Sequence, residues 1–449
     1  MVCQSYVQVK EHLERELKLD PGINKLAYPA QVYWEPITGK EVLSIWQQIE
    51  GSAVVYLHVP YCTTKCNFCG FYTQIDSKEG RDRSVSALEK ELEIYTQNLD
   101  LSRIRVEALS VGGGTPSQLS VKEFDRVLSA FYGTFYRDKL RDAQVEIAPD
   151  NYVTEEKLRF LKERGINRIS AGIEMWNDEL KRKSRRPDGD TVENNHRVCH
   201  LVKNLGFDFN IDLLYGLPGQ TLDDLEKSIR ISLSYDPDQL SVYAVSLKPK
   251  MGFFRDEEAH QTLEEKLGMY ERARTMLREA GYEQQTRNNF VKNNNTCLYE
   301  VRFAQGVPTL GLGTTAVSFV ESLAYRNAKI QESYFKKLAE GNLPVQVVYR
   351  YNPEEQINAF IIKNLEWLSV DLTDLGNRFG VDIKETHKEV LQALQDFGLV
   401  QIEENILRIT DQGIFFVTAI KRCFYDADYI RKREDYYREK VASLRVVSS

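Results

Sequence analysis

The sequence predicts an α/β protein: a partial (β/α)6 barrel followed by a smaller C-terminal winged-helix-like domain. Three observations support this fold. Apolar, strand-like runs alternate with helical stretches from about residue 51 to residue 245, as they do in parallel sheets. After residue 351 the pattern changes to short helices and then a small hairpin. The chain has 449 residues, of which 42% are hydrophobic, so it can bury the cores of two or three domains.

The chain begins with a segment that we interpret as an N-terminal arm over residues 1–50. A helix is expected over residues 6–19, because Asp20-Pro21-Gly22 follows it and such residues end helices. Beyond this point, aromatic residues and prolines occur without a clear period. We therefore assign this segment to an arm and not to the core domain.

The core domain is expected over residues 51–350. Its predicted strands cover residues 53–59, 106–111, 145–148, 168–172, 207–214 and 239–245. Its predicted helices cover residues 85–99, 121–135, 155–164, 192–205, 222–235 and 263–279, and the glycine-punctuated stretch 309–318 is expected to close the core. Six strand and helix pairs are too few for a complete eight-stranded barrel but enough for a partial one. An open, doubly wound sheet is the alternative.

The C-terminal domain is expected over residues 351–449. Helices are predicted at 354–365, 372–380 and 383–397, with strands at 399–403 and 407–409. Such a domain often binds DNA. The third helix carries nearly balanced charges, however, and the whole chain has 59 Lys and Arg against 66 Asp and Glu, a net charge of -7. We therefore predict no nucleic-acid partner.

The composition also bears on the compartment. No stretch approaches 18 uninterrupted apolar residues, so no membrane span is predicted. The first ten residues contain no apolar signal region, and we predict a cytoplasmic protein. Four of the seven cysteines stand alone and three are clustered, which indicates reduced thiols and one metal site instead of a disulfide framework.

The clustered cysteines are Cys62, Cys66 and Cys69, directly after the first core strand. Thiolates select soft metal centres such as zinc, copper(I) or an iron-sulfur cluster. A structural zinc site normally uses four protein ligands, and His58 is the only close nitrogen, at an alternating strand position that makes ligation doubtful. Three ligands on a four-iron cluster would leave one iron open for a cofactor. A Cys3His zinc site or a chance cluster of thiols is the alternative.

This C-x3-C-x2-C run resembles the signature of the radical S-adenosylmethionine (SAM) superfamily. The resemblance implies a partial (β/α)6 barrel in which Cys62, Cys66 and Cys69 hold a [4Fe-4S] cluster and SAM binds the fourth iron. It also implies reductive cleavage of SAM to a 5'-deoxyadenosyl radical, with an electron donor such as flavodoxin or ferredoxin. The cofactor supplies the chemistry, and the protein positions it.

A second motif, Gly112-Gly113-Gly114-Thr115-Pro116-Ser117, follows the second core strand. Glycines allow close backbone approach to a ligand, although a tight turn would need them equally. Together with the cysteines, the motif resembles the oxygen-independent coproporphyrinogen III oxidase group, which implies that Gly112, Gly113 and Thr115 lie against SAM. The resemblance covers about residues 54–433, including the segments 311–318 and 409–425.

Further residues match this group at strand ends, where ligands of parallel α/β folds collect. The resemblance implies that Tyr56 lies beside the SAM sulfonium, Glu146 contacts SAM, Asp212 lies near the ribose and Arg186 pairs with the SAM carboxylate. We expect Tyr56 and Glu146 to be catalytic as well. Phe68, Gly70 and Glu174 are also expected cofactor contacts. Glu174 replaces the glutamine usual in the group, so it can accept but not donate a hydrogen bond. Core packing or helix capping would explain these polar residues otherwise.

One position distinguishes between the enzyme types within this group. The oxidases carry a fourth cysteine two residues after the third cluster ligand, and this chain has Phe71 there. That form resembles the class C methylases, the cyclopropane-forming enzymes and the anaerobic haem-degrading methylases. The resemblance implies a methyltransferase-type enzyme that uses two SAM molecules to alkylate an sp2 carbon of a flat, aromatic or tetrapyrrole substrate. Oxidative decarboxylation of coproporphyrinogen and a haem chaperone without turnover are the alternatives.

Overall fold

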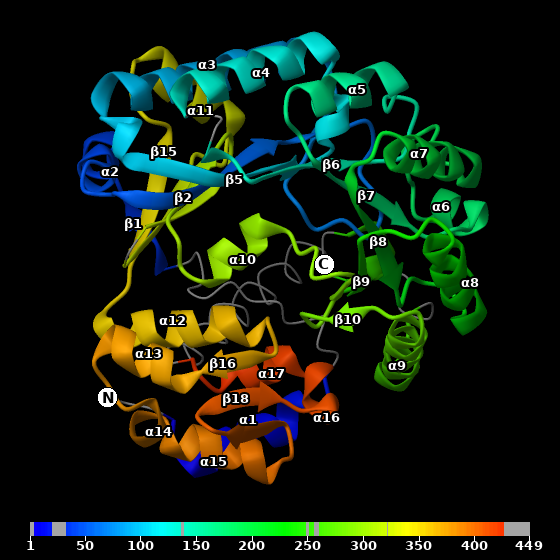
Figure 1. Cartoon of the computed structure of the whole chain (residues 1–449), viewed down its shortest axis with the longest axis vertical. Coiled ribbons are helices and arrows are strands. Elements are labelled where there is room, and N and C mark those ends of the chain that lie inside the picture. Colours follow the sequence, from blue (N-terminus) through cyan, green and yellow to red (C-terminus); the bar gives the residue numbers. More distant parts are fainter. Residues whose placement is uncertain are drawn as a thin grey trace, which may run out of the picture. The chain divides into compact units, whose positions relative to one another are not determined.

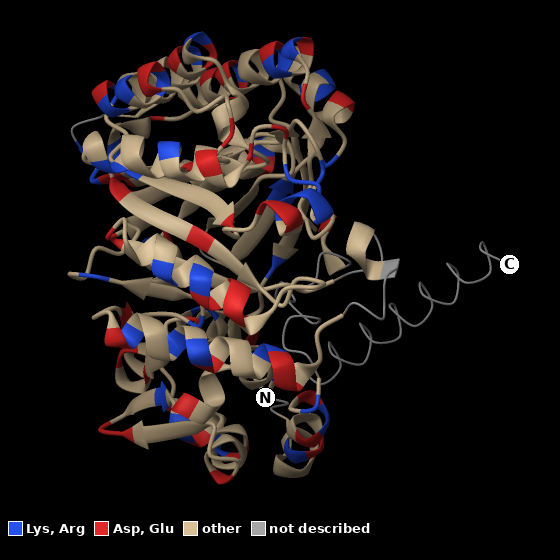
Figure 2. Ribbon diagram, turned by 90° about the vertical axis from the view of Figure 1, so that its right-hand side faces the viewer, with Lys and Arg blue, Asp and Glu red and all other residues tan. Residues whose placement is uncertain are grey.

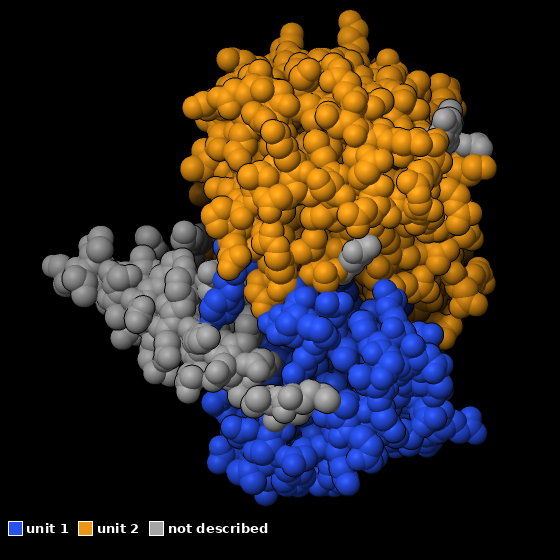
Figure 3. All heavy atoms as spheres, turned by 90° about the vertical axis from the view of Figure 1, so that its left-hand side faces the viewer, with its two compact units in different colours: residues 1–34, 351–449 blue, residues 35–350 orange. Residues whose placement is uncertain are grey.

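The computed structural model describes residues 4–19, 33–135, 139–247, 251–255, 260–320 and 322–425. The chain divides into two compact units (Figure 3). One unit comprises Glu35–Arg350, and the other combines Met1–Trp34 with Tyr351–Ser449. The predicted helix-ending residues Asp20-Pro21-Gly22 lie outside the described residues.

A single mixed sheet forms the framework of the Glu35–Arg350 unit (Figure 1). Its parallel strands, in spatial order, are β12 (Thr309–Leu312), β2 (Gly51–Val59), β5 (Ile104–Gly113), β6 (Asp142–Ile147), β7 (Arg168–Glu174), β8 (Asp208–Tyr215) and β9 (Gln239–Ala244). Antiparallel strands extend one edge with β11 (Asn289–Val291) and β10 (Glu283–Gln284), and the other with β13 (Val317–Val320), β14 (Leu323–Asn327), β15 (Val345–Arg350) and β1 (Glu35–Pro36). This confirms the predicted α/β class.

The six predicted core strands are present, and β12 adds a seventh parallel strand beside β2. The helices follow the outer side of the curved sheet (Figure 1), so the partial barrel is confirmed over the doubly wound alternative. These outer helices are α3 (Lys78–Asn98), α4 (Val121–Thr134), α5 (Glu155–Glu163), α7 (Val192–Asn204), α8 (Leu222–Leu233) and α9 (Leu263–Glu279). Each begins directly after a Ser or Thr whose side chain accepts a hydrogen bond from the first turn, which satisfies a backbone donor that would otherwise lack a partner.

The alternation of side chains along the strands separates the core from the barrel interior. On β2, Val55, Leu57 and Val59 are buried, whereas Tyr56 and His58, which alternate with them, remain partly accessible. The same alternation leaves Glu146 on β6 and Asp212 on β8 partly accessible between buried neighbours. Because successive strand residues point to opposite faces, the apolar set packs under the outer helices and the polar set lines the interior.

The N-terminal arm prediction needs a correction over residues 35–50. β1 pairs antiparallel with β15, and α2 (Gly39–Trp46) buries Val42 and Trp46. The Trp46 indole N–H donates to the hydroxyl of Tyr325 on β14 at 2.6 Å. This segment therefore belongs to the barrel unit. The sequence did not indicate this, because a strand partner more than 300 residues later leaves no local pattern.

The other unit contains the predicted short helices and hairpin. Its elements are α1 (Tyr6–Glu16), α12 (Pro353–Leu365), β16 (Ser369–Asp371), α13 (Leu372–Phe379), α14 (Ile383–Thr386), α15 (Lys388–Asp396), β17 (Val400–Glu403), β18 (Ile406–Ile409), α16 (Asp411–Ile414) and α17 (Val417–Arg422). The hairpin gains β16 as a third strand. The predicted third helix is divided at His387, whose imidazole lies 2.9 Å from the side-chain oxygen of Asn358.

Charged residues of both signs are interspersed along the described helices (Figure 2). None of the helices in the described ranges combines the length and the apolar character that a membrane crossing requires. The chain as a whole carries a net charge of -7, so a positive surface has to be sought locally.

A buried carboxyl group on α3 holds the turn between β12 and β13. Glu91 is fully buried and accepts hydrogen bonds from the backbone N–H of Gly313 at 2.9 Å, the amide of Asn327 at 2.6 Å and the hydroxyl of Tyr334 at 2.6 Å. Burial nevertheless raises the pKa of Glu91 to about 7. The folded protein therefore binds a proton at this site more tightly than the unfolded chain does.

We expect Glu91 to make the protein less stable as pH rises from about 4.5 to about 7, because the proton is lost first from the unfolded chain. A shift of this size corresponds to a change of about 3 kcal/mol in the free energy of unfolding. Glu91→Gln should flatten this part of the pH dependence, measured by urea unfolding. Glu156→Gln, at an exposed glutamate on α5, is the matched control. An unchanged pH slope in Glu91→Gln would contradict the assignment.

Candidate active site

The three clustered cysteines lie on a loop that leaves β2 through the short strand β3 (Tyr61–Cys62) and returns through β4 (Gln74–Ile75). The Cys62 sulfur lies 3.3 Å from the Thr115 hydroxyl, and the Cys66 sulfur lies 3.7 Å from the Arg186 guanidinium. Burial, reinforced by the neighbouring Cys69 and Cys66, raises the pKa of Cys62 to about 11. The three thiols therefore act on one another electrostatically.

This donor set suits a cluster of several irons. Across the described ranges, no three His, Cys, Asp or Glu side chains are close enough to hold one metal ion. In a [4Fe-4S] cluster each thiolate binds a different iron, so the three sulfurs need not meet at a single point. Burial raises the pKa of the Cys66 thiol, and the Arg186 guanidinium beside it acts in the opposite direction, toward the thiolate form that metal binding requires. His58 contacts Tyr56 at 3.3 Å and is not among the groups acting on Cys62.

The glycine motif fastens the end of β5 to the cysteine loop. The backbone N–H of Gly114 donates to the carbonyl of Val59 at 2.8 Å, and that of Thr115 donates to the carbonyl of Tyr61 at 2.7 Å. A Cβ on Gly114 would lie 2.7 Å from the Tyr61 carbonyl oxygen. Gly114 is therefore needed because two backbone segments approach each other closely here. This agrees with the alternative that the glycines serve a tight turn.

Gly112 and Gly113 make room for two interior side chains. A Cβ on Gly112 would lie 2.6 Å from the Glu146 carboxyl group, and one on Gly113, whose φ is +119°, would lie 2.6 Å from the His58 ring. The Gly113 N–H donates to Glu146 at 3.2 Å. The structure thus brings the motif, Tyr56 and Glu146 together at the carboxyl ends of neighbouring strands.

The barrel interior holds several carboxyl groups. Burial, reinforced by the carboxylate of Asp212, raises the pKa of Glu146 to about 7. Asp212 accepts hydrogen bonds from the Ser170 hydroxyl at 2.7 Å and the Asn210 amide at 3.0 Å. Asp212 also contributes to the raised pKa of Glu174. Its charge therefore affects both Glu146 and Glu174.

Arg186 is held in place by buried partners. Its guanidinium donates to Asp190 at 2.6 Å and to the carbonyl of Gly172 at 2.7 Å, and it lies 3.6 Å from Glu174. The second Asp190 oxygen accepts from the buried Lys181 ammonium at 2.5 Å. Glu174 adopts a left-handed conformation with φ of +65°. A carboxylate at this position therefore serves as a counter-ion to Arg186, a role that an amide cannot fill.

Two of the expected cofactor contacts pack against protein atoms. Phe68 packs on a buried apolar cluster that includes Met175, Leu180 and Leu217. Gly70 is exposed, and a Cβ there would meet the Met251 side chain at 2.6 Å. Their contacts in the structure therefore shape the cysteine loop.

Several residues of the site were not found from the sequence. Tyr299 and Glu300 lie on α10 (Leu298–Ala304), a helix drawn on the inner side of the sheet (Figure 1). The rings of Tyr299 and Tyr56 are 6.2 Å apart, and Glu300 accepts from the Asn289 amide at 3.0 Å. Burial, reinforced by Asp212, raises the pKa of Glu300 to about 7. Asp190 was not predicted from the sequence either, although it lies only four residues after Arg186.

An aromatic cavity of about 280 Å³ adjoins Tyr56. It is lined by Tyr56, His58, Tyr299, Phe303, Thr315, Ala316, Val317 and Phe319. The Nε2 atom of His58 is buried there without a hydrogen-bond partner in the described ranges, and burial lowers the His58 pKa to about 4. The cavity therefore offers mostly apolar walls and one buried imidazole nitrogen.

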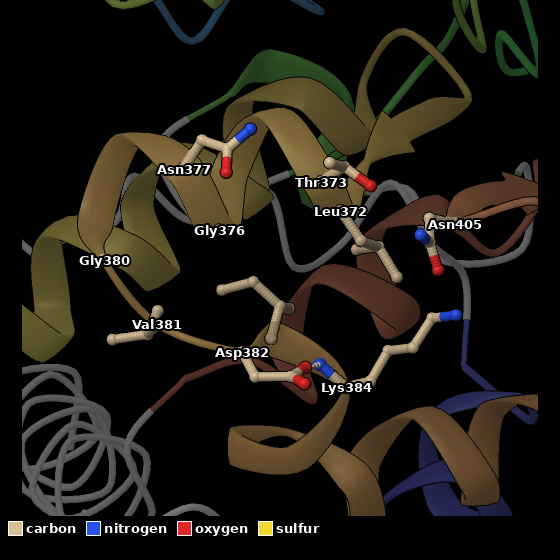
Figure 4. Close-up of a pocket in the computed structure, with 10 residues that line it drawn as sticks. Leu372, Thr373, Gly376, Asn377, Gly380, Val381, Asp382, Lys384 and Asn405 are labelled. Carbon is tan, nitrogen blue, oxygen red and sulfur yellow. Dashed lines mark hydrogen bonds between the residues drawn. The ribbon is translucent and has the colours of Figure 1, made fainter.

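A second cavity of about 510 Å³ lies in the C-terminal part of the other unit. Thr373 and Asn377 on α13 line one side, and Asp382 and Lys384 line the other (Figure 4). Asp382 accepts from the backbone N–H of Lys384 at 2.9 Å as the cap of α14. None of the predicted site residues lines this cavity.

Comparison with known families agrees with this geometry. Residues 56–231 match the radical SAM superfamily, and residues 351–416 match the HemN C-terminal domain. The chain contains a radical SAM domain followed by a HemN C-terminal domain. Its cofactors are accordingly a [4Fe-4S] cluster and SAM, which the three thiols fit.

Relatives are similar over most of the chain. The heme chaperone HemW of Bacillus subtilis is 27% identical over 80% of this chain and 95% of its own. An oxygen-independent coproporphyrinogen III oxidase of Helicobacter pylori is 28% identical over 85% of this chain and 87% of its own. The anaerobilin synthase of Escherichia coli O157:H7 is 25% identical over 90% and 92%. The solved coproporphyrinogen III oxidase HemN from Escherichia coli shares the fold, with a TM-score of 0.79 and 23% identity over 89% of this chain and 96% of that one.

Proposed function

We propose that this radical SAM protein is an enzyme that acts on a tetrapyrrole. The observation that supports this most directly is the near full-length similarity to relatives whose names refer to heme, coproporphyrinogen and anaerobilin. The thiol cluster at the carboxyl ends of the strands supports the radical chemistry, because ligands of parallel α/β folds bind there. The cofactor pair supplies a strongly hydrogen-abstracting radical when both parts are bound.

We propose the following roles for the residues of the chain. Cys62, Cys66 and Cys69 bind three irons, and Thr115 orients the Cys62 sulfur. Arg186, held by Asp190, presents its guanidinium to a carboxylate, a pairing for which its fork is suited.

The interior acids have separate roles in this proposal. Glu146 and Asp212 accept hydrogen bonds from hydroxyl or ammonium groups, and Glu174 holds Arg186 in position. Gly112 and Gly113 leave the space that Glu146 and His58 occupy. Because Glu146 has its pKa raised to about 7, it can hold or release a proton near neutral pH.

The substrate would place one ring in the aromatic cavity beside Tyr56. A volume of about 280 Å³ lies at the lower end of ligand pockets, which is enough for part of a tetrapyrrole. The rings of Tyr56, Tyr299 and Phe303 offer faces for a flat system. The unpartnered His58 nitrogen can form a hydrogen bond to a pyrrole nitrogen, and the apolar walls exclude water from the radical.

The first reaction that we propose is oxidative decarboxylation of a coproporphyrinogen propionate, in keeping with the relatives named for that activity. A second candidate is alkylation of an sp2 carbon with a second SAM, and Phe71 is the observation that favours it. Phe71 is 73% exposed at the position where the oxidases resembled by this chain carry a cysteine. Its side chain is not part of the buried core, so core packing does not account for a phenylalanine at this position.

One anaerobic experiment separates these reactions. The reconstituted protein is given SAM and dithionite with either coproporphyrinogen III or haem, and 5'-deoxyadenosine, S-adenosylhomocysteine and tetrapyrrole products are quantified by mass spectrometry. Protoporphyrinogen with 5'-deoxyadenosine is the result expected for the first reaction. S-adenosylhomocysteine with a methylated tetrapyrrole would establish the second and overturn the first. Haem binding with no SAM-derived product would overturn both and leave the chaperone function.

Phe71→Cys provides the companion variant. Because Phe71 is largely exposed, the exchange should change the stability by no more than about 0.5 kcal/mol. If Phe71 determines the reaction, the variant should shift products from alkylation toward decarboxylation. Identical products from both proteins would show that Phe71 does not determine the reaction.

A further inference from the structure

The aromatic cavity beside Tyr56 has no charged group on its lining at neutral pH. None of the residues that line it is an acid, a lysine or an arginine, and burial lowers the pKa of His58 to about 4. The rings of Phe303 and Phe319 pack edge to face there, with their centroids 5.0 Å apart. A flat substrate that carries carboxylates therefore needs its counter-charge at the edge of this cavity.

Strand β14 brings Arg326 to that edge. In the antiparallel pair of β13 and β14, Arg326 lies directly opposite Val317, and Val317 lines the cavity. Side chains at opposite positions of two strands share one face of the sheet, with their Cβ atoms about 4.5–5.5 Å apart. The half-buried side chain of Arg326 therefore adjoins the cavity wall.

The residue before Arg326 fixes the face of the sheet. The Tyr325 hydroxyl accepts a hydrogen bond from Trp46 of α2 at 2.6 Å and lies 3.4 Å from the hydroxyl of Tyr95 on α3. Tyr325 therefore points toward the outer helices. Because successive strand residues point to opposite faces, Arg326 points to the inner face, on which Val317 meets the cavity.

Two other arginines of this region serve different groups. Arg302 lies on α10, but its guanidinium donates to Glu107 at 2.7 Å. Arg350 on β15 lies opposite Leu323, which precedes Arg326 by three residues and so stands on the other face of the sheet. Of these three arginines, Arg326 is the one that the register places on the cavity side.

The electrostatics of Arg326 also differ from those of the arginines in buried ion pairs. Around Arg168 and Arg186 the cost of burial is outweighed by nearby acids, and the pKa of each is raised. Burial instead lowers the pKa of Arg326. Arginine stays protonated in proteins, so the folded protein holds this cation at a net electrostatic cost. A ligand carboxylate beside it would reduce that cost.

We propose that Arg326 binds a carboxylate of the substrate whose ring occupies the aromatic cavity. This inference rests on the proposed tetrapyrrole function and deepens it, because it makes the anionic side chains of the macrocycle the recognition element. A guanidinium can donate a pair of parallel hydrogen bonds to one carboxylate, and partly buried surroundings strengthen such a pair. Coproporphyrinogen and haem both carry propionates, so the inference holds for either proposed reaction.

The test compares a carboxylate ligand with its neutral counterpart on the anaerobically reconstituted protein. The probes are coproporphyrin III and its tetraamide, and their affinities are measured by titration of the porphyrin fluorescence. Arg326→Gln should weaken the binding of coproporphyrin III about tenfold, near the lower end of what a hydrogen bond to a charged group contributes. It should leave the binding of the tetraamide unchanged. Arg326→Lys keeps the charge without the planar fork and should fall between Arg326→Gln and the wild type.

The matched control is Arg350→Gln, which removes the same charge from the outer face of the neighbouring strand and should bind both porphyrins as the wild type does. Equal weakening of both porphyrins in Arg326→Gln, or weakening of neither, would overturn the inference, because the side chain would then support the fold or take no part in binding.

The methionine carboxylate of SAM is the other carboxylate that could pair with Arg326. The affinity for SAM, measured by equilibrium dialysis, should be the same in Arg326→Gln and the wild type. A tenfold loss of SAM affinity would assign the carboxylate to SAM and overturn the inference. A wild-type protein that binds neither porphyrin would overturn the proposed tetrapyrrole function and this inference with it, whereas the variant results above overturn the inference alone.

Discussion

Cys66→Ala is expected to remove the iron-sulfur cluster and with it the cleavage of SAM. The Cys66 sulfur lies beside the Arg186 guanidinium, and its thiol interacts with that of Cys69. With one of three thiolates gone, two protein ligands remain for a cluster that already leaves one iron open. The iron content should fall from about four per chain to near zero, and 5'-deoxyadenosine formation should fall by at least about 1,000-fold. Both are measured after anaerobic reconstitution.

Cys199→Ala is the control for this loss. Cys199 is buried on α7, so its replacement removes a thiol without touching the cysteine loop and should cost about 1 kcal/mol of stability at most. The variant should keep its iron and its cluster absorbance. Full iron content in Cys66→Ala, and likewise in the alanine variants of Cys62 and Cys69, would refute the ligand assignment.

Asp190→Ala is expected to have the largest effect on stability. Asp190 is fully buried and neutralises two cations, Lys181 with 2% exposure and Arg186 with 8%. Removal of the shared carboxylate leaves both cations buried with one counter-ion fewer. Breaking a buried pair in this way costs about 3–5 kcal/mol. The free energy of unfolding, obtained from urea titration of the cluster-free protein, should fall by that amount.

Asp188→Ala is the matched control, because Asp188 is exposed two residues earlier on the same loop. Its stability should stay within about 0.5 kcal/mol of the wild type. Asp190→Asn keeps the shape and one acceptor and should fall between the two. If Asp190→Ala were as stable as Asp188→Ala, the network of Lys181, Asp190 and Arg186 could not be what holds Arg186 beside Cys66.

Much of the site could be predicted because it lies at the ends of strands. Tyr56, Glu146 and Asp212 each stand at an alternating position near the carboxyl end of a parallel strand. The spacing of the three cysteines and their place after the first core strand indicated an iron-sulfur centre from the sequence alone. Their assignment to individual cofactor contacts stays a prediction.

The parts that were missed depend on contacts between distant segments. α10 contributes Tyr299 and Glu300 from a short helix without a strong amphipathic pattern, and Glu300 meets Asp212 only across the interior. The packing of Phe68 against Leu217 was not foreseen either, and its contact with the cofactor stays a prediction. β1 joins the barrel unit by pairing with β15. None of these partnerships leaves a local trace in the sequence.

The sequence by itself determined the α/β class, the alternation of strands and helices in the core and the clustering of three cysteines on one loop. Each follows from local patterns: apolar strand-like runs, the helical stretches between them, and the spacing of ligands within one loop. Only the tertiary structure decided that the stretch expected to close the core pairs with β2 as β12, that Glu174 lies beside Arg186 and that Asp190 joins Arg186 to Lys181. The physical reason is that burial changes the energetics of a charge. The sequence alone does not tell what a given carboxylate does. The groups that the fold brings within a few ångströms decide whether it serves as a counter-ion, a proton-binding site or a structural link.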